Sequence, residues 1–166
     1  MNYNNKFKEK KNLFLKKENI FIFLIILFCV FLDRYTKNEV ISNFSENVFF
    51  INNFINIDLI WNTGIGFGFL STESSLFYNL VSALVGVVIV TLCYFIIISE
   101  VTDKLIYAII IGGAIGNFYD RLIFNAVPDF IDLHYDRYHW FTFNVADIFI
   151  TLGIIIFLIN EFLKNK

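Results

Sequence analysis

Four long apolar runs dominate this chain, and their lengths suit helices that cross a membrane. Three runs carry no charged side chain, and the fourth carries a single acid, Asp147. The runs cover residues 20–32, 76–98, 105–118 and 145–159. Because a helix needs about 20 apolar residues to cross a bilayer, the first must continue through Asp33 to about residue 37. The pattern predicts an all-α polytopic membrane protein with four transmembrane helices.

The two longer segments between these runs are expected to lie at one membrane surface. Residues 48–62 alternate partly between apolar and polar positions, which predicts short β-strands rather than a separate soluble domain. Residues 120–144 form the most polar segment of the second half, and Pro128 prevents an uninterrupted helix there. Because apolar residues surround its acids, we expect this segment to fold back onto the protein core.

The composition agrees with a membrane protein. Hydrophobic residues make up 57% of the chain and its mean hydropathy is +0.65, whereas soluble domains are about 45–50% apolar. The formal net charge of −2 argues against a nucleic-acid partner. Cys29 and Cys93 lie inside apolar runs, so we expect buried thiols rather than a disulfide or a metal site.

The distribution of lysines predicts the orientation of the chain. Lysines cluster before the first run and recur at Lys104 and at the C-terminus, and together they outnumber the basic residues of the two longer segments. By the positive-inside rule, both termini are cytoplasmic and the acids lie near the outer face. No small-residue cleavage site follows the first run, so we expect an uncleaved helix rather than a signal peptide. Residues 1–19 then form a basic cytoplasmic tail against anionic lipid, and residues 20–166 form a single domain.

Two carboxylates at the outer edge of the predicted helices are the main candidates for chemistry. A charged group in a bilayer costs roughly 2.5–3.5 kcal/mol on insertion scales. Taken singly, Asp147 could complement the dipole at the start of the last helix, and Asp129 could be a solvated loop acid. Together they suggest a dyad, because two close carboxylates share one proton near neutral pH. The ionised acid then activates water while the other protonates a carbonyl oxygen, which cleaves a peptide without a metal.

Polar residues and glycines accompany this pair. Asp33 and Lys37 have the i,i+4 spacing of an ion pair on one helix face. Gly112 and Gly116 have the GxxxG spacing that lets membrane helices pack closely. That spacing does not explain the polar residues that follow, which either orient the loop or contact a substrate carbonyl or a lipid phosphate. These residues are Asn117, Asp120 and Arg121. Elsewhere in the chain, the glycines at 64, 66 and 68 predict tight turns or close approach of the backbone to another group.

Other site types are not supported by the sequence. It contains no HExxH or GxSxG motif, and no phosphate-binding glycine loop followed by Lys and Ser or Thr. His134, Asp136 and His139 match no established metal-ligand spacing. We therefore expect neither a metal nor a cofactor.

Five short motifs in order give the chain a resemblance to a known family. They are DRYTK (33–37), NTGIGF (62–67), GNFYDR (116–121), VPDF (127–130) and FNVAD (143–147). With the matching apolar runs, they make the chain similar to bacterial lipoprotein signal peptidase, also called signal peptidase II. The sequence departs from the family pattern at Ile65 and Gly66, where two alanines are usual, and at Pro128. Asp132 and Asp136 are additional acids near Asp129, so Asp132 is an alternative partner for Asp147.

The resemblance implies an intramembrane aspartic endopeptidase in the bacterial cytoplasmic (inner) membrane. Its substrates would be diacylglyceryl-modified prolipoproteins, cut just before the lipidated cysteine, and it would contact membrane phospholipid and act as a monomer without a cofactor. The implied residues are a catalytic pair, four substrate-binding residues and three residues that support the site. In that order they are Asp129 and Asp147; Asn62, Asn117, Arg121 and Asn144; and Asp33, Lys37 and Asp120.

A different class of protein must also be considered. A small polytopic transporter or accessory protein could use its acids to couple protons or cations. A transporter places such groups near the midplane of several helices. Here residues 76–98 contain no acid, and the acids gather at one edge of the predicted helices. The sequence therefore favours the peptidase.

Overall fold

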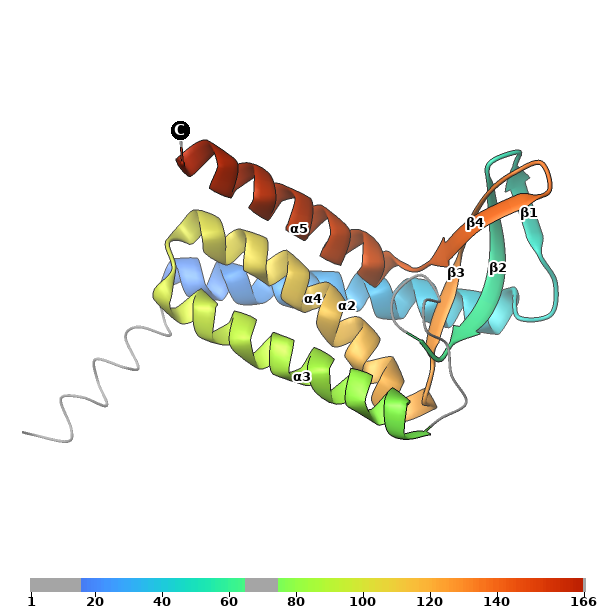
Figure 1. Cartoon of the computed structure of the whole chain (residues 1–166), viewed down its shortest axis with the longest axis horizontal. Helices are drawn as coiled ribbons and strands as arrows, with labels where there is room; N and C mark the ends of the chain where they lie inside the picture. The colour runs from blue at the N-terminus through green and yellow to red at the C-terminus, as the bar shows by residue number, and fades with distance from the viewer. Residues whose placement is uncertain (1–15, 65–74, 166) are drawn as a thin grey trace, which may run out of the picture.

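Four long helices form the body of the protein in a computed structural model, which describes residues 16–64 and 75–165 (Figure 1). Within these residues, each helix is long and apolar enough to cross a membrane, which confirms the predicted number of spans. The helices are α2 (Lys17–Asn43), α3 (Ser75–Ile98), α4 (Val101–Phe124) and α5 (Val145–Lys164). Helix α2 continues well past Asp33, as the short first run required.

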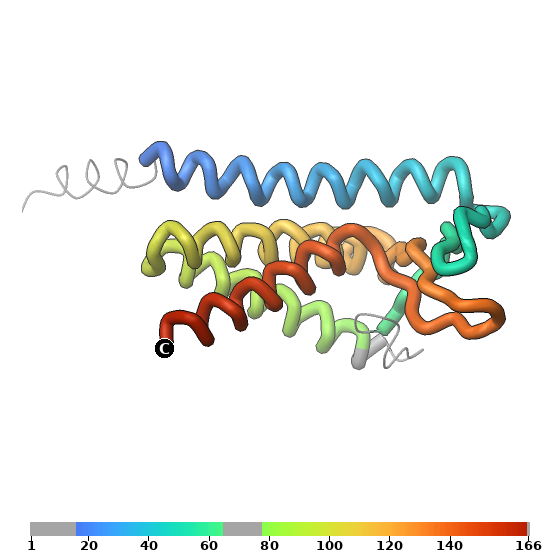
Figure 2. Tube along the Cα trace, turned by 90° about the horizontal axis from the view of Figure 1, so that it is seen from above, coloured from blue at the N-terminus to red at the C-terminus, as the bar shows by residue number. Residues whose placement is uncertain are grey.

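Helix α4 is the central element, because it packs against each of the other three helices (Figures 1 and 2). Its apolar window is 44% buried, whereas only 11–17% of the corresponding windows in the other helices is buried. The other three helices therefore present most of their apolar surface outward, as expected for helices in contact with lipid. The start of α2 and the end of α5 lie at the same end of the helices (Figure 2).

A four-stranded antiparallel sheet lies at the opposite end of the helices (Figure 1). Its strands, in sheet order, are β1 (Phe49–Asn52), β2 (Ile55–Asn62), β3 (Val127–Tyr135) and β4 (Tyr138–Phe143). The strands predicted within 48–62 are thus confirmed, and the polar segment 120–144 is mainly a β-hairpin rather than a loop. Pro128 occupies the second position of β3, near a strand end, where proline is tolerated.

The sheet leads directly into the last helix. Strand β4 ends at Phe143, and α5 begins at Val145 after the single residue Asn144. Strand β2 carries an irregularity between Ile57 and Ile60 where it pairs with β3. The start of β3 and the start of α5 lie in the same region of the protein, because Asn144 donates a hydrogen bond to Asp129. Residues 1–15, 65–74 and 166 lie outside the described residues, and they include Gly66, Gly68 and most of the predicted basic tail of residues 1–19. The last residues of that tail belong to α2, which begins at Lys17.

Glycines on α4 allow close approach of its neighbours. A Cβ added to Gly112 would collide with the Cβ of Cys29 on α2, and one added to Gly116 would collide with the carboxylate of Asp33. A Cβ at Gly113 would lie 2.5 Å from the backbone carbonyl oxygen of Ala146 on α5. The GxxxG spacing therefore has the packing role that the sequence indicated, and it also brings Asp33 against α4.

Replacing Gly116 with alanine should destabilise the protein. Alanine favours a helix by up to about 1 kcal/mol over glycine, but overpacking of a tight contact costs about 1–3 kcal/mol. Here the added methyl group must displace the buried Asp33 carboxylate, so we expect a lower midpoint of thermal unfolding in detergent. Gly86→Ala on α3 is the matched control, because its added Cβ would lie 3.4 Å from Phe118 in ordinary contact. Equal midpoints for the two variants would contradict this account.

Candidate active site

Asp129 is held near the start of β3 by strand pairing and by two amides. It lies opposite Ile60 of β2 and is 2% exposed. Asn62, at the end of β2, donates its Nδ2 hydrogen to Asp129 Oδ2 at 2.8 Å. Asn144 donates its own Nδ2 hydrogen to Asp129 Oδ1. Both carboxylate oxygens therefore have donors, which lowers the cost of burying this acid.

Asp147 lies in the first turn of α5, where it forms a capping box with Asn144. The backbone N–H of Asp147 donates to Asn144 Oδ1 at 3.0 Å, and the backbone N–H of Asn144 donates to Asp147 Oδ2 at 3.2 Å. Asn117 of α4 donates its Nδ2 hydrogen to the other oxygen, Oδ1, at 2.8 Å. The capping role that Asp147 could have by itself is therefore present, and the side chain has an interhelical contact as well.

Asn144 connects the two acids. Its side-chain oxygen accepts from the backbone of Asp147, while its side-chain nitrogen donates to Asp129. This residue is fully buried between β4 and α5. One amide thus fixes a carboxylate on a strand relative to a carboxylate on a helix.

The proximity of the two acids affects the ionisation of Asp129. Burial and, to a smaller extent, the negative charge of Asp147 raise the pKa of Asp129 from 3.8 to about 7. The hydrogen bonds from Asn62 and Asn144 oppose this shift because they stabilise the carboxylate. Near neutral pH, Asp129 is therefore able to hold a proton beside a second acid, as general acid–base catalysis requires.

A buried ion network lies behind Asp147 and joins α2 to α4. Lys37 Nζ lies 2.8 Å from Asp33 Oδ2 and 2.7 Å from Asp120 Oδ2, and all three side chains are fully buried. Arg34 contacts the same two carboxylates, so two cations neutralise two acids. Lys37 also donates to Asn117 Oδ1 at 2.8 Å, which orients the amide that binds Asp147.

The network reaches α5 as well. Asp33 Oδ1 accepts the backbone N–H of Ala146 at 3.0 Å, one residue before Asp147. The i,i+4 ion pair of Asp33 and Lys37 that the sequence predicted is thus present. It connects α2 to both α4 and α5, rather than stabilising the end of α2 alone. These contacts agree with the supporting role that the resemblance implies for Asp33, Lys37 and Asp120, and that role stays a prediction.

Arg121 differs from the asparagines of the site because part of its guanidinium group has no hydrogen-bond partner among the described residues. Its Nη2 donates to the backbone oxygen of Gly64, and its guanidinium carbon lies 5.4 Å from the ring centre of Tyr78. Among the residues that the structure describes, Nε and Nη1 of Arg121 are buried and have no hydrogen-bond partner. Unpaired buried donors are costly, so the N–H groups on these two nitrogens are available to an acceptor on a bound molecule.

An open cleft of about 330 Å³ reaches both acids. Its polar end contains five of the predicted site residues, and aliphatic side chains of α3, α4 and α5 line the remainder. The polar residues are Asn62, Asn117, Arg121, Asp129 and Asp147, and the aliphatic ones include Val81, Leu84, Val88, Ile110 and Ile154. The cleft can therefore bind an apolar chain and expose one polar bond to a pair of carboxylates.

The additional acids of the sequence lie elsewhere. Asp132 Oδ2 lies 2.8 Å from His139 Nδ1, within hydrogen-bond distance, and Asp132 does not line the cleft. Asp136 is exposed in the β3–β4 turn with a positive φ of 53°. Among the described acids, Asp129 is therefore the better partner for Asp147.

The sequence prediction omitted two residues of this region. Arg34 neutralises Asp120 and Asp33, and its place in the DRYTK motif was the available signal. Tyr78 lies against Arg121 and donates its hydroxyl hydrogen to the Arg121 carbonyl oxygen at 3.1 Å. Nothing in the apolar run around Tyr78 distinguishes it from its neighbours.

Comparison with known proteins connects this arrangement to a family. Residues 25–163 match the family model described as signal peptidase (SPase) II. A lipoprotein signal peptidase of Pelagibacter ubique is 42% identical over 154 residues, which cover 90% of this chain and 93% of that protein. A lipoprotein signal peptidase of Syntrophus aciditrophicus is 36% identical over 157 residues, covering 90% and 98% respectively.

Solved structures agree with the sequence relatives. The fold is similar to a bacterial membrane enzyme determined by the in meso method at 2.3 Å resolution, with a TM-score of 0.74 and 29% identity. That match covers 87% of this chain and 89% of the other. A second bacterial membrane enzyme gives a TM-score of 0.66 at 30% identity, covering 84% and 91%. This chain is therefore a multi-pass bacterial membrane protein, and it belongs to the signal peptidase II family.

Proposed function

We propose that this protein is an aspartic endopeptidase that removes signal peptides from prolipoproteins whose cysteine carries diacylglycerol. Its relatives are named lipoprotein signal peptidases. The observation that carries the aspartic mechanism is the placement of Asp129 and Asp147 at the polar end of one apolar cleft. Asn144 bridges the two carboxylates. A proton-coupling transporter is not favoured, because the described acids of the cleft gather at one end of it.

The contacts support a different proposed role for each acid. Asp147 lies at a helix N-terminus and accepts N–H groups from Asn117 and Asn144, which favours its ionised form as the general base. Asp129 holds a proton up to about neutral pH and is the general acid. Asp147 removes a proton from water as the water oxygen attacks the peptide carbonyl carbon. Asp129 gives its proton to the carbonyl oxygen, and collapse of the diol returns that proton to Asp129 while Asp147 protonates the leaving amine.

Arg121 is proposed to bind the substrate backbone. Its Nε and Nη1 hydrogens, which have no partner among the described residues, suit a peptide carbonyl oxygen near the acids. The three asparagines already contact the two carboxylates, so their first task is to position Asp129 and Asp147. Any contact that Asn62, Asn117 or Asn144 makes with substrate uses their remaining hydrogen-bonding capacity.

The proposed orientation puts both termini in the cytoplasm and the sheet at the extracytoplasmic face. The lysine distribution supports this orientation. The start of α2 and the end of α5 also share one end of the helices, opposite the sheet (Figure 2). The cleaved bond would then lie near the outer membrane surface.

Removing either acid should abolish cleavage. Asn cannot exchange the proton, so Asp129→Asn and Asp147→Asn should each lose at least about a thousandfold in kcat, and the double variant should lose little more. Cleavage of a diacylglyceryl-modified prolipoprotein, followed on a gel, measures this loss. Asp136→Asn is the matched control, because Asp136 is exposed in a turn and asparagine tolerates its positive φ. Substantial turnover by either single variant would refute the dyad.

Activity should fall above neutral pH. The pKa of Asp129 is about 7, so the free enzyme loses the proton of its general acid as pH rises through that value. We expect kcat/KM to decrease by about tenfold per pH unit on the alkaline side. The measurement is a kcat/KM profile in detergent, with thermal unfolding recorded at each pH to exclude loss of fold. A rate that stays constant from pH 7 to about pH 9 would contradict a protonated Asp129.

The lipid on the substrate should matter. Each methylene buried in an apolar environment contributes about 0.8 kcal/mol, and the aliphatic walls of the cleft are open to such a chain. We expect a diacylglyceryl-modified precursor to be cleaved at least about tenfold more efficiently than the unmodified precursor of the same sequence. Both are assayed in the same detergent at equal concentration. Equal rates would show that only the peptide is recognised, and the lipoprotein specificity would then be wrong even if the dyad stood.

A further inference from the structure

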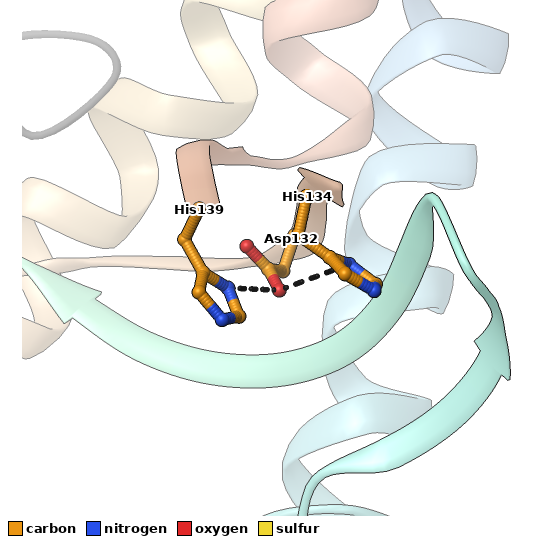
Figure 3. Close-up of side chains that lie close together, drawn as sticks. All are labelled: Asp132, His134 and His139. Carbon is orange, nitrogen blue, oxygen red and sulfur yellow. Dashed lines mark hydrogen bonds and ion pairs between the residues drawn. The ribbon is translucent and has the colours of Figure 1, made fainter. Parts of the chain in front are cut away.

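A second group of side chains with metal-binding chemistry lies on the sheet (Figure 3). None of its three residues lines the cleft. Asp132 and His134 are two positions apart on β3, so they share one face of the strand. His139 of β4 pairs directly with His134 across the hairpin. One potential ligand atom from each residue lies within 4.8 Å of the other two.

The geometry of the group is close to that of a coordination site. Asp132 Oδ2 lies 2.8 Å from His139 Nδ1 and 3.6 Å from His134 Nδ1. In a tetrahedral site with metal–ligand bonds of about 2.0–2.1 Å, neighbouring ligand atoms are about 3.3 Å apart. Both imidazoles direct a nitrogen toward the same carboxylate oxygen (Figure 3). Small side-chain rotations would therefore accommodate an ion.

An unsatisfied buried nitrogen makes this group different from an ordinary Asp–His hydrogen bond. His134 is 6% exposed, and its Nδ1 has no hydrogen-bond partner among the described residues. Its position is fixed, because its backbone N–H donates to the carbonyl oxygen of Phe54 at 2.9 Å. A buried polar atom without a partner carries a free-energy cost, and coordination of a cation would remove it.

A second unsatisfied atom lies on the neighbouring strand. Asn56 of β2 is the cross-strand partner of Asp132, so their side chains share a face of the sheet. Asn56 is 8% exposed, and its Oδ1 also has no hydrogen-bond partner within the described part of the chain. A fourth ligand can therefore come from this amide oxygen or from water, while the side chain of His139, 57% exposed, leaves a path for entry.

We propose that Asp132, His134 and His139 bind a divalent transition-metal ion of the zinc type. Two imidazole nitrogens with one carboxylate suit Zn²⁺ and its neighbours, whereas Mg²⁺ and Ca²⁺ prefer sites built from oxygen. The ion would join β3 to β4, and β3 also carries Asp129. This role is separate from the proposed peptide hydrolysis, which the ion does not enter.

Zinc titration of the full-length, untagged protein tests this proposal. The protein is treated with chelator, transferred to metal-free detergent buffer and titrated with ZnCl2 in a calorimeter, with MgCl2 as the second arm. The chain contains only two histidines, and both belong to this site. We expect one Zn²⁺ to bind with micromolar or tighter affinity and to raise the midpoint of thermal unfolding. We expect Mg²⁺ to bind more weakly and to leave the unfolding midpoint unchanged.

His139→Ala is the informative variant, because this exposed side chain can be removed without leaving a cavity. It should weaken Zn²⁺ binding at least tenfold and abolish the rise in the unfolding midpoint. Tyr138→Ala, at a neighbouring exposed position of β4, is the matched control and should bind Zn²⁺ like the wild type. No binding by the wild type below millimolar Zn²⁺ would overturn the proposal. Equal affinity in His139→Ala would place the zinc elsewhere, for example at the exposed Cys93, and would overturn it too. Because binding is the readout, neither result bears on the peptidase mechanism.

Discussion

The site depends on one interaction, the buried ion pairing of the Lys37 ammonium group with the carboxylates of Asp33 and Asp120. A single unpaired charge among membrane helices would cost several kcal/mol, so Lys37, Asp33 and Asp120 are only tolerable together. Their pairing joins α2 to α4, and Asp33 adds a hydrogen bond to the start of α5. The glycine at 116 makes this possible, since a larger residue would occupy the space of the Asp33 carboxylate. The close packing of α2 against α4 at Gly116 and the ion pairing of Asp33 with Lys37 therefore depend on each other.

The same network determines the environment of the proposed general base. Lys37 orients the amide of Asn117, and that amide donates to Asp147. Asp147 is at the same time part of the capping box that begins α5. A residue that starts a helix has a well-defined position, and the helix N-terminus favours its negative charge. Structural support and proposed chemistry therefore use the same atoms.

The second acid is held by a different type of element. Asp129 lies on a strand whose pairing fixes its backbone, and two asparagine amides fix its carboxylate. Burial and the neighbouring charge keep a proton on it near neutral pH. An apolar cleft adds to this effect, because a low-dielectric surrounding disfavours a second negative charge. The proton that the proposed hydrolysis requires is therefore held at the polar end of the apolar cleft.

The sequence by itself determined the helices, because apolar runs of sufficient length report directly on burial in lipid. It also indicated the strands of 48–62, and the five motifs located the residues that gather around the cleft.

The sequence left open which side chains contact one another across the fold. Asp33 binds the backbone of Ala146, 113 residues away, and Asn144 bridges both acids only because β4 ends one residue before α5. The sequence spacing of His134, Asp136 and His139 matched no metal-ligand pattern, and the structure places Asp132 rather than Asp136 beside the two histidines. Strand register turns Asp132 toward His139, whereas a positive φ puts Asp136 in the turn. Side-chain partners between distant segments follow from register and helix packing, which no local pattern of residues encodes.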